Sequence, residues 1–337
     1  MNDYILKEIK LKNFRSHEDY DLDCRKNTTL ILGENGCGKT SVLEAIYIAM
    51  QGKSFRAVDK EIIKRRTDFY RVELEYSDGL KVVVLYDDSS ARKTFLVKDK
   101  KTARLPKQYK YPVSLFLPED LHLLSTSPTK RREYFDRFIS QTDNYYYSSL
   151  LRYNKALKQR NELLKQEFID NESLFSWNIL LARYGVDLKN RRKKIAKGIN
   201  DRITDVYRSI AKNKDEILMS YCNHTRDISE SEYLKLLEMD FERDKITGHT
   251  NFGVHKDDFI FMFNQKEADG NASRGEVRSI VLALKFIEAE LIKEITGRKP
   301  IVLLDDVFSE LDQERRKSLI KNFEDHQVIL TSVEGVK

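Results

Sequence analysis

The spacing of hydrophobic and polar positions predicts a sheet wrapped around one strong helix in residues 1–125. Residues 4–14 are predicted to form a strand, and the apolar run at 28–32 ends in a glycine turn. Apolar residues then recur at helical spacing over residues 40–50, which predicts an amphipathic helix. A β-meander follows, because three runs at 72–76, 81–86 and 94–97 read as strands and Asp78-Gly79 supplies a turn.

The pattern changes after Pro128. Residues 131–242 contain no proline and only two glycines, Gly185 and Gly198. Leucines, tyrosines and basic residues recur there at helical spacing, which predicts several long helices. We therefore expect a separate helical lobe at residues 126–246.

Mixed structure is predicted again from residue 247. Residues 278–296 read as a helix that ends before Pro300, and 301–304 and 327–330 read as buried strands. The expected buried stripe of this helix is Ile280, Leu284, Ile287, Leu291 and Ile295. Strands at both ends of the chain predict one α/β domain, residues 1–125 with 247–337, interrupted by the helical lobe.

Composition excludes several classes of protein. The 337 residues are 40% hydrophobic and 34% charged, with a net charge of +6. No apolar run approaches the roughly 18 residues needed to span a bilayer. The first residues lack a secretory pattern, and the three cysteines are too scattered for a disulfide framework or a zinc site. We expect a cytoplasmic protein without a membrane partner.

Residues 33–40, Gly-Glu-Asn-Gly-Cys-Gly-Lys-Thr, fit the phosphate-loop pattern between a strand and a helix. Backbone N–H groups of such a loop surround phosphate oxygens, Lys39 adds a cation, and the Thr40 hydroxyl can ligate Mg²⁺. A chance match in a tight turn is the alternative, and the strand and helix around the loop disfavour it. The residues expected to bind ATP are Gly33, Glu34, Asn35, Gly36, Cys37, Gly38, Lys39, Thr40 and Ser41.

A second motif follows the apolar run at residues 301–304, where Asp305 and Asp306 emerge at the end of the predicted strand. Ligands bind at the carboxyl ends of parallel strands. Asp305 is expected to hold Mg²⁺ with Thr40, and Asp306 to orient or deprotonate the attacking water. A buried strand that simply ends in a polar turn is the alternative.

A third motif, Ala272-Ser273-Arg274-Gly275-Glu276, directly precedes the predicted helix. It resembles the signature motif of ABC-type ATPases, although a serine before a helix is also an ordinary cap. In that superfamily this motif meets the ATP of a second protomer, which assigns Ser273 and Gly275 to the partner's nucleotide.

With these motifs the chain resembles the RecF family over nearly its whole length. The resemblance rests on residues 11–15 (Leu-Lys-Asn-Phe-Arg), 116–121 (Phe-Leu-Pro-Glu-Asp-Leu), 253–258 (Gly-Val-His-Lys-Asp-Asp) and 303–312 (Leu-Leu-Asp-Asp-Val-Phe-Ser-Glu-Leu-Asp). It is supported by residues in the predicted helical lobe, namely Tyr153, Leu157, Gln159, Arg160, Asn161 and Trp177.

The resemblance implies an SMC-like ABC-type ATPase head with a helical second lobe. It implies a protein that binds ATP and Mg²⁺, forms an ATP-dependent homodimer, binds single-stranded, gapped and duplex DNA, and hydrolyses ATP slowly. The implied role is recombinational gap repair within the SOS response, where RecF proteins work with RecO and RecR to load RecA.

The chain also departs from the family pattern. Glu276 stands where the family usually has glutamine, which would place a carboxylate near the partner's γ-phosphate unless the side chain turns away. Thr331 stands where many ABC ATPases use histidine, but here the chain follows its family, which also tends to have threonine at this position. Asp306 is shorter than the glutamate common in the superfamily, in keeping with slow turnover.

DNA contact is less specified by the sequence. Residues 151–200 hold 12 Lys and Arg against 5 Asp and Glu. The cluster Arg191, Arg192, Lys193, Lys194 and Lys197 is the candidate DNA-binding site, with a solvated basic helix face as the alternative. Tyr145, Tyr146 and Tyr147 are expected to pack between helices rather than stack on bases, and His255 is expected to be structural.

Two other functions remain as alternatives. An SMC-type structural head that tethers DNA needs hundreds of coiled-coil residues between its nucleotide motifs, whereas 264 residues separate Thr40 from Asp305 here. An ATPase subunit of a membrane transporter would carry a shorter helical insertion and dock on a membrane partner.

Overall fold

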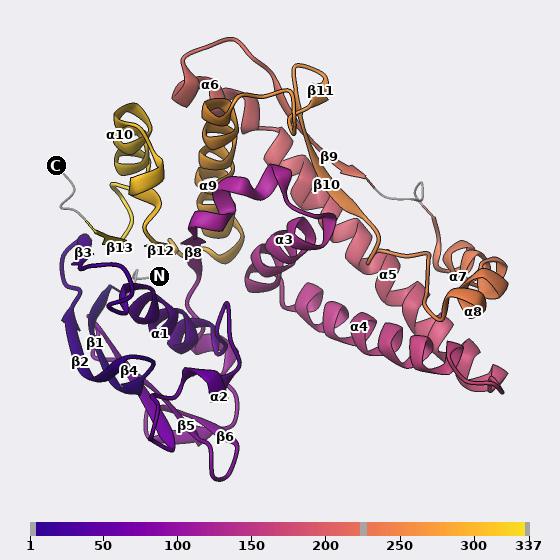
Figure 1. Ribbon diagram of the computed structural model, residues 1–337, viewed down its shortest axis with the longest axis horizontal. Helices are drawn as coiled ribbons and strands as arrows, with labels where there is room; N and C mark the ends of the chain where they lie inside the picture. Colours follow the sequence, from indigo (N-terminus) through magenta and orange to yellow (C-terminus); the bar gives the residue numbers. More distant parts are fainter. Residues whose placement is uncertain (1–4, 223–227, 334–337) are drawn as a thin grey trace. The chain divides into compact units, whose positions relative to one another are not determined.

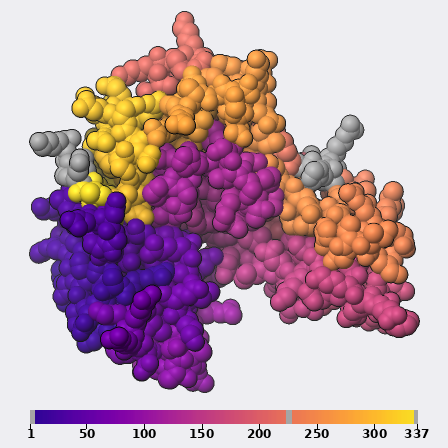
Figure 2. Space-filling view, in the orientation of Figure 1, coloured from indigo at the N-terminus to yellow at the C-terminus, as the bar shows by residue number. Residues whose placement is uncertain are grey.

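The computed structural model describes residues 5–222 and 228–333. These residues form two compact units. The first unit contains the chain up to Leu121 together with the chain from Val281 onward, and the second contains His122–Ile280. Figure 2 shows the two chain segments of the first unit, indigo to purple and yellow, packed against each other.

The first unit contains a buried sheet of four parallel strands in the order β3-β13-β12-β8. Every residue of β8, β12 and β13 is buried. Strands buried on both faces read as continuous apolar runs, which is why Ile301–Leu304 was recognisable in the sequence. The strands are β3 (Thr28–Leu32), β13 (Val328–Ser332), β12 (Ile301–Leu304) and β8 (Val113–Phe116).

An antiparallel sheet of six strands forms a second layer of this unit, in the order β2-β1-β4-β5-β6-β7. Strand β4 of this sheet alternates buried and more exposed residues, as expected for a sheet with one face on the core. The strands are β1 (Leu6–Phe14), β2 (His17–Asp23), β4 (Phe69–Tyr76), β5 (Lys81–Asp87), β6 (Arg92–Val97) and β7 (Lys100–Thr102).

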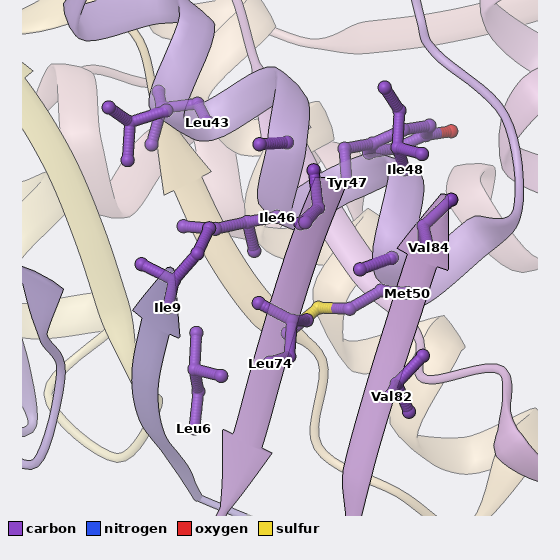
Figure 3. Packing of buried hydrophobic residues seen from close by; sticks show 14 of the residues in the cluster. Leu6, Ile9, Leu43, Ile46, Tyr47, Ile48, Met50, Leu74, Val82 and Val84 are labelled. Atoms are coloured by element: carbon purple, nitrogen blue, oxygen red, sulfur yellow. The ribbon is translucent and has the colours of Figure 1, made fainter. Parts of the chain in front are cut away.

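Helix α1 (Lys39–Gln51) contacts strands of both sheets, and every one of its residues except Thr40 is buried. Figure 3 shows Ile46 and Met50 of α1 beside Ile9, Leu74 and Val84 of the antiparallel sheet. The helix predicted at residues 40–50 is confirmed, but its predicted amphipathic character is wrong, because a helix enclosed by two sheets is buried on all sides. Because the phosphate loop joins β3 to α1, the buried helix fixes the position of that loop.

The remaining helices of the first unit are short apart from α9 (Arg274–Thr296), which begins in the second unit. The predicted stripe of α9 is buried except for Ile295, which is 48% exposed near the helix end. The others are α2 (Asp59–Ile62), η1 (Lys107–Tyr109), η3 (Val307–Glu310) and α10 (Gln313–Asn322). Helix η2 (Pro118–Ser125) begins in the first unit and ends in the second.

The second unit is built on helices, of which α4 and α5 pack together as a long pair (Figure 1). Two of these helices are capped by the residue that precedes them in the sequence. The Ser127 side chain accepts a hydrogen bond from the Lys130 N–H at the start of α3, and the Asp143 side chain caps α4 in the same way. The helices are α3 (Pro128–Thr142), α4 (Asn144–Leu164), α5 (Asn171–Asn200), α6 (Ile203–Ala211), α7 (Glu230–Met239) and α8 (Phe241–Thr247).

The second unit also has a small antiparallel sheet in the order β11-β10-β9. Its strands are β9 (Ile217–Cys222), β10 (Asp258–Phe263) and β11 (Lys266–Glu267). The structure therefore ends the second unit at residue 280, whereas the sequence analysis drew the boundary at 246. The physical reason is that β10 pairs with β9, which the sequence analysis read as helix, and so the segment after residue 246 folds with the helices.

Six strands of the described residues were absent from the sequence analysis: β2, β7, β8, β9, β10 and β11. Strand β2 has only partly buried or exposed residues, so it lacks the apolar signal of a core strand. In β8 Ser114 interrupts the apolar run, and β9 begins shortly after a helix, which makes both hard to separate from their surroundings by periodicity.

Candidate nucleotide-binding site

The phosphate loop lies between β3 and α1 as predicted. Gly38 is the N-cap residue of α1 at φ 103°, and a Cβ there would come within 2.5 Å of the Ser16 Oγ and His17 Nε2 atoms. Only glycine fits that backbone and that close approach. Residues 34–37, which include Cys37, are exposed, so this part of the loop is open to solvent.

The Lys39 ammonium is held before any ligand arrives. Its Nζ donates to the carbonyl oxygens of Gly33 at 2.8 Å and Glu34 at 3.2 Å, and lies 3.6 Å from Asp306 Oδ2. Lys39 is only 5% exposed, although the loop in front of it is open to solvent. A cation fixed in this way is preorganised for a phosphate oxygen.

The first carboxylate of the predicted pair, Asp305, is buried beside Thr40. The Thr40 hydroxyl donates to Asp305 Oδ1 at 2.9 Å, and the Thr331 hydroxyl donates to the same oxygen at 2.8 Å. Burial raises the pKa of Asp305, and the two hydroxyl hydrogen bonds oppose that rise. Thus two oxygen donors predicted to share a magnesium ion lie side by side, although they are far apart in sequence.

The second carboxylate, Asp306, sits in a left-handed backbone conformation with φ 46° and ψ 19°. Its backbone N–H donates to the Thr331 Oγ1 at 2.8 Å. Its Oδ1 atom is buried without a hydrogen-bond partner among the described residues, while Oδ2 faces Lys39. The carboxylate therefore points to the mouth of the phosphate loop with an oxygen whose hydrogen-bonding capacity is not used.

A cavity of 500 Å³ opens in front of these groups, with a lining contributed entirely by the first unit. It is lined by Arg15, Ser16, Asn35, Gly36, Gly38, Lys39, Thr40, Ser41, Arg56, Glu61, Ile63, Arg65 and Asp306. Another cavity of 490 Å³ lies over the antiparallel sheet, where Arg71 and Lys81 already pair with Glu73. Only the first cavity brings the phosphate loop and a strand-end carboxylate together.

The sequence analysis assigned no role to the three arginines that line this cavity, and two of them share a buried partner. Arg15 and Arg56 each donate two hydrogen bonds to Glu44, a fully buried residue of α1. Burial alone would raise the pKa of Glu44, but these bonds and one from Ser54 lower it below its ordinary value. The buried carboxylate thus fixes two cations at the edge of an anion site, and no sequence pattern connects the three residues.

The predicted signature residues lie in the second unit, at the start of α9. The Ser273 N–H donates to the Glu276 Oε2 at 2.7 Å, and the Glu276 N–H donates to the Ser273 Oγ at 3.3 Å. This reciprocal arrangement is a capping box. Glu276 therefore turns back onto Ser273 in this structure, and Ser273 itself is exposed.

The predicted DNA-binding cluster is divided by burial. Arg192 is only 2% exposed and donates to the Tyr146 hydroxyl, the Val254 carbonyl and the Asp136 carboxylate, so it has no access to a phosphate. Arg191 pairs with the carboxylates of Asp143 and Asp187. Lys194 and Lys197 are exposed, and Lys193 is half-buried. The inclusion of Arg192 in this cluster was wrong, because a guanidinium buried among partners stabilises the unit's interior.

The tyrosines considered as DNA-stacking residues differ in their burial. Tyr146 is buried and donates to Asp136, whereas Tyr145 is 75% exposed with the Arg191 guanidinium 5.7 Å above its ring. The prediction that all three tyrosines pack between helices is therefore wrong for Tyr145.

His255 is held by both ring nitrogens within the second unit. Its Nε2 donates to the Thr250 carbonyl at 2.9 Å, so its Nδ1 accepts from the Tyr153 hydroxyl at 2.7 Å. Burial lowers the pKa of His255 to about 4. The histidine is thus neutral near pH 7 and its hydrogen bonds are used inside the unit, as expected for a structural residue.

No helix in residues 5–222 and 228–333 is long and apolar enough to cross a membrane. In the same residues no group of three or more His, Cys, Asp or Glu is placed to hold a metal ion.

Known proteins resemble this chain along almost its entire length. The family described as AAA ATPase domain matches residues 5–242. The DNA replication and repair protein RecF of Clostridium acetobutylicum is 34% identical over 334 residues, covering 97% of this chain and 92% of that protein. RecF of Clostridium perfringens has the same identity and the same coverage.

Solved structures give the same picture. A structure of the recombination mediator protein RecF-ATPrS in the RecFOR pathway matches with a TM-score of 0.90 and 29% identity, covering 99% of this chain and 94% of that one. An Smc head domain bound to the C-terminal domain of ScpA from Pyrococcus furiosus matches with a TM-score of 0.54 and 14% identity, covering 98% and 90%. The second likeness is one of fold alone. The predicted fold class, an SMC-like ABC-type ATPase head interrupted by a second lobe, is confirmed.

Proposed function

The chain belongs to the RecF family of DNA replication and repair proteins, and from this membership we propose that it is an ATP-gated DNA clamp of recombinational gap repair. ATP binding drives dimerisation, and slow, DNA-stimulated hydrolysis resets the clamp. One observation carries the nucleotide part of the proposal. A single cavity contains the phosphate loop, the fixed Lys39 ammonium and the Asp306 carboxylate.

The triphosphate is bound by the loop and Lys39. The backbone N–H groups of residues 34–38 and the start of α1 supply donors and a positive helix end. The Lys39 ammonium is already held within the loop. It can therefore bind the β- and γ-phosphates without further ordering of its side chain. These groups bind and orient the nucleotide rather than react with it.

Mg²⁺ would be held by Thr40 and Asp305. The chemistry of the donors fits, since magnesium takes oxygen ligands and usually only one or two from protein, with phosphate and water completing its shell. The Thr40 Oγ1 and Asp305 Oδ1 atoms are 2.9 Å apart, and both are oxygens. When bound, the ion neutralises charge on the β- and γ-phosphates.

Asp306 is proposed to activate the attacking water. Its unpartnered Oδ1 gives it an acceptor for a water proton, and its neighbour Lys39 marks the γ-phosphate end of the loop. Aspartate reaches less far than glutamate, which supports a slow ATPase used as a switch.

Dimerisation is proposed to complete the nucleotide site. Ser273 and Gly275 belong to the second unit and the phosphate loop to the first. Ser273 is exposed at the N-terminus of a helix, which favours an anion there. We assign these residues to the γ-phosphate bound by a second copy of the chain.

DNA is proposed to meet the basic face of α5 at Lys193, Lys194 and Lys197, of which the last two are exposed. Such lysines bind phosphates without reading sequence. RecO and RecR are the proposed protein partners, because the RecF structure that resembles this chain is described within the RecFOR pathway. We also propose a cytoplasmic location, since the proposed function acts on DNA.

The test is a binding assay with gapped, duplex and single-stranded DNA, with and without a non-hydrolysable ATP analogue. We expect the analogue to tighten binding to gapped or duplex DNA. The double variant Lys194→Ala/Lys197→Ala should weaken it and flatten its salt dependence. The matched control is Lys10→Ala/Lys12→Ala, which removes the same charge from the antiparallel sheet of the first unit. If the affinity for DNA is the same with and without the ATP analogue, gating by ATP is refuted.

A further inference from the structure

The hydroxyl of Thr331, at the carboxyl end of β13, joins the two carboxylate residues of the site. Thr331 is 0% exposed. Its Oγ1 accepts the Asp306 backbone N–H at 2.8 Å and donates to the Asp305 Oδ1 at 2.8 Å. The donor directions are unambiguous, because a backbone N–H only donates and the hydroxyl has a single proton to give.

Strand order explains why this position reaches both residues. In the parallel sheet β13 lies between β3, which leads into the phosphate loop, and β12, which leads into Asp305. Thr331 pairs with Ile31 of β3, and its neighbour Leu330 pairs with Leu304 of β12. A side chain at this position therefore lies beside the backbone that turns at Asp306.

That backbone needs a fixed contact. Asp306 has φ 46°, a region that residues other than glycine seldom adopt and that persists only where the surroundings hold it. Its side chain accepts no hydrogen bond at Oδ1 from the described residues, and Oδ2 stands 3.6 Å from Lys39. The direction of the carboxylate is thus set mainly by the backbone, and the backbone N–H is held by Thr331.

We propose that Thr331 is a positioning residue for ATP hydrolysis: its hydroxyl holds the left-handed turn at Asp306 and thereby aims the Asp306 carboxylate across the phosphate loop. The inference rests on the proposed ATPase function. Thr331 is buried behind the two carboxylates, so it acts through Asp306 and not by contact with the nucleotide. Its removal should slow the chemical step and leave nucleotide binding nearly intact.

Three variants test this. Thr331→Val keeps the shape and removes the hydroxyl, whereas Thr331→Ser keeps the hydroxyl. The control is Thr29→Val on β3 of the same sheet, since the Thr29 Oγ1 is buried without a hydrogen-bond partner among the described residues. If Thr331→Val does not fold, Thr331→Cys replaces it, because a thiol donates and accepts only weakly.

In single-turnover hydrolysis Thr331→Val should lower kcat by about tenfold or more, since it loses a hydrogen bond to a charged group and leaves a buried N–H unpaired. Affinity for a non-hydrolysable ATP analogue should stay within about threefold, because the loop contacts are unchanged. Thr331→Ser should recover most of kcat, and Thr29→Val should match the wild type.

A measurement without nucleotide separates this inference from the proposed function. Hydrogen–deuterium exchange in peptides that cover the Asp306 amide should be about tenfold faster or more in Thr331→Val, and unchanged in Thr331→Ser and Thr29→Val. Slow exchange at Asp306 in Thr331→Val would overturn the inference, as would a wild-type kcat in that variant. If the wild-type protein neither binds nor hydrolyses ATP, the proposed function fails, and the exchange result still decides whether Thr331 holds the turn.

Discussion

Replacing Lys39 by alanine removes the charge on which the proposed nucleotide site depends. Lys39 is 5% exposed, and its Nζ lies within hydrogen-bond distance of the Gly33 and Glu34 carbonyls and 3.6 Å from Asp306. The substitution frees two carbonyls on a loop that is open to water. We therefore expect the fold to lose less than about 1 kcal/mol, since water can replace those bonds.

The effect on ATP binding should be larger. A hydrogen bond to a charged group contributes about 1.5–3 kcal/mol, which corresponds to roughly 10- to 150-fold in Kd. The Asp306 carboxylate offsets part of the ammonium charge, so we expect the lower part of this range, roughly 10- to 40-fold.

Isothermal titration with a non-hydrolysable ATP analogue measures the change. The control is Lys26→Ala, which removes the same charge from an exposed position between β2 and β3 and should leave Kd unaltered. Unchanged affinity in a folded Lys39→Ala protein would refute the assignment of the loop as the ATP site. An equal loss in Lys26→Ala would show that the effect comes from net charge alone.

Asp306→Asn keeps the side-chain shape and removes the charge that activates water. The rate of ATP hydrolysis should therefore fall, while the ATP-bound dimer and its DNA complex should last longer. Hydrolysis at the wild-type rate would contradict the role assigned to Asp306. Ser273→Arg puts a bulky side chain at the signature position, and sedimentation with an ATP analogue should find it monomeric with near-normal ATP affinity; a normal dimer would refute the two-copy site. Glu276→Gln can keep the capping box and removes a carboxylate, so the same assay should find a tighter dimer; no change would mean that the carboxylate stays turned onto the Ser273 N–H. Arg160→Met leaves the carboxylate partner of Arg160 buried, both side chains being 0% exposed, and should destabilise the protein by about 3–5 kcal/mol in urea unfolding. The exposed control Arg25→Met should unfold at nearly the wild-type urea concentration.

The sequence by itself determined the parts of this protein that depend on neighbours in the chain. The phosphate loop needs glycines, a lysine and a threonine at fixed offsets between a strand and a helix, and all of them lie within residues 28–51. Strand β12 is four apolar residues long and is followed directly by two aspartates. Its burial and the polar site after it could therefore both be predicted from the sequence. The resemblance to the RecF family rests on motifs of the same local kind, and the comparisons confirm it.

Only the tertiary structure decided how distant side chains are used. Arg15, Glu44 and Arg56 become one cluster, and Thr331 joins Asp305 to Asp306, because strands and helices far apart in sequence pack together. Arg192 has the same charge in the sequence as Lys194, yet folding buries the first among partners and leaves the second in water. The pairing of β10 with β9 likewise settles where the second unit ends. Charge and hydropathy belong to each residue alone, whereas burial and hydrogen-bond partners belong to the packed chain.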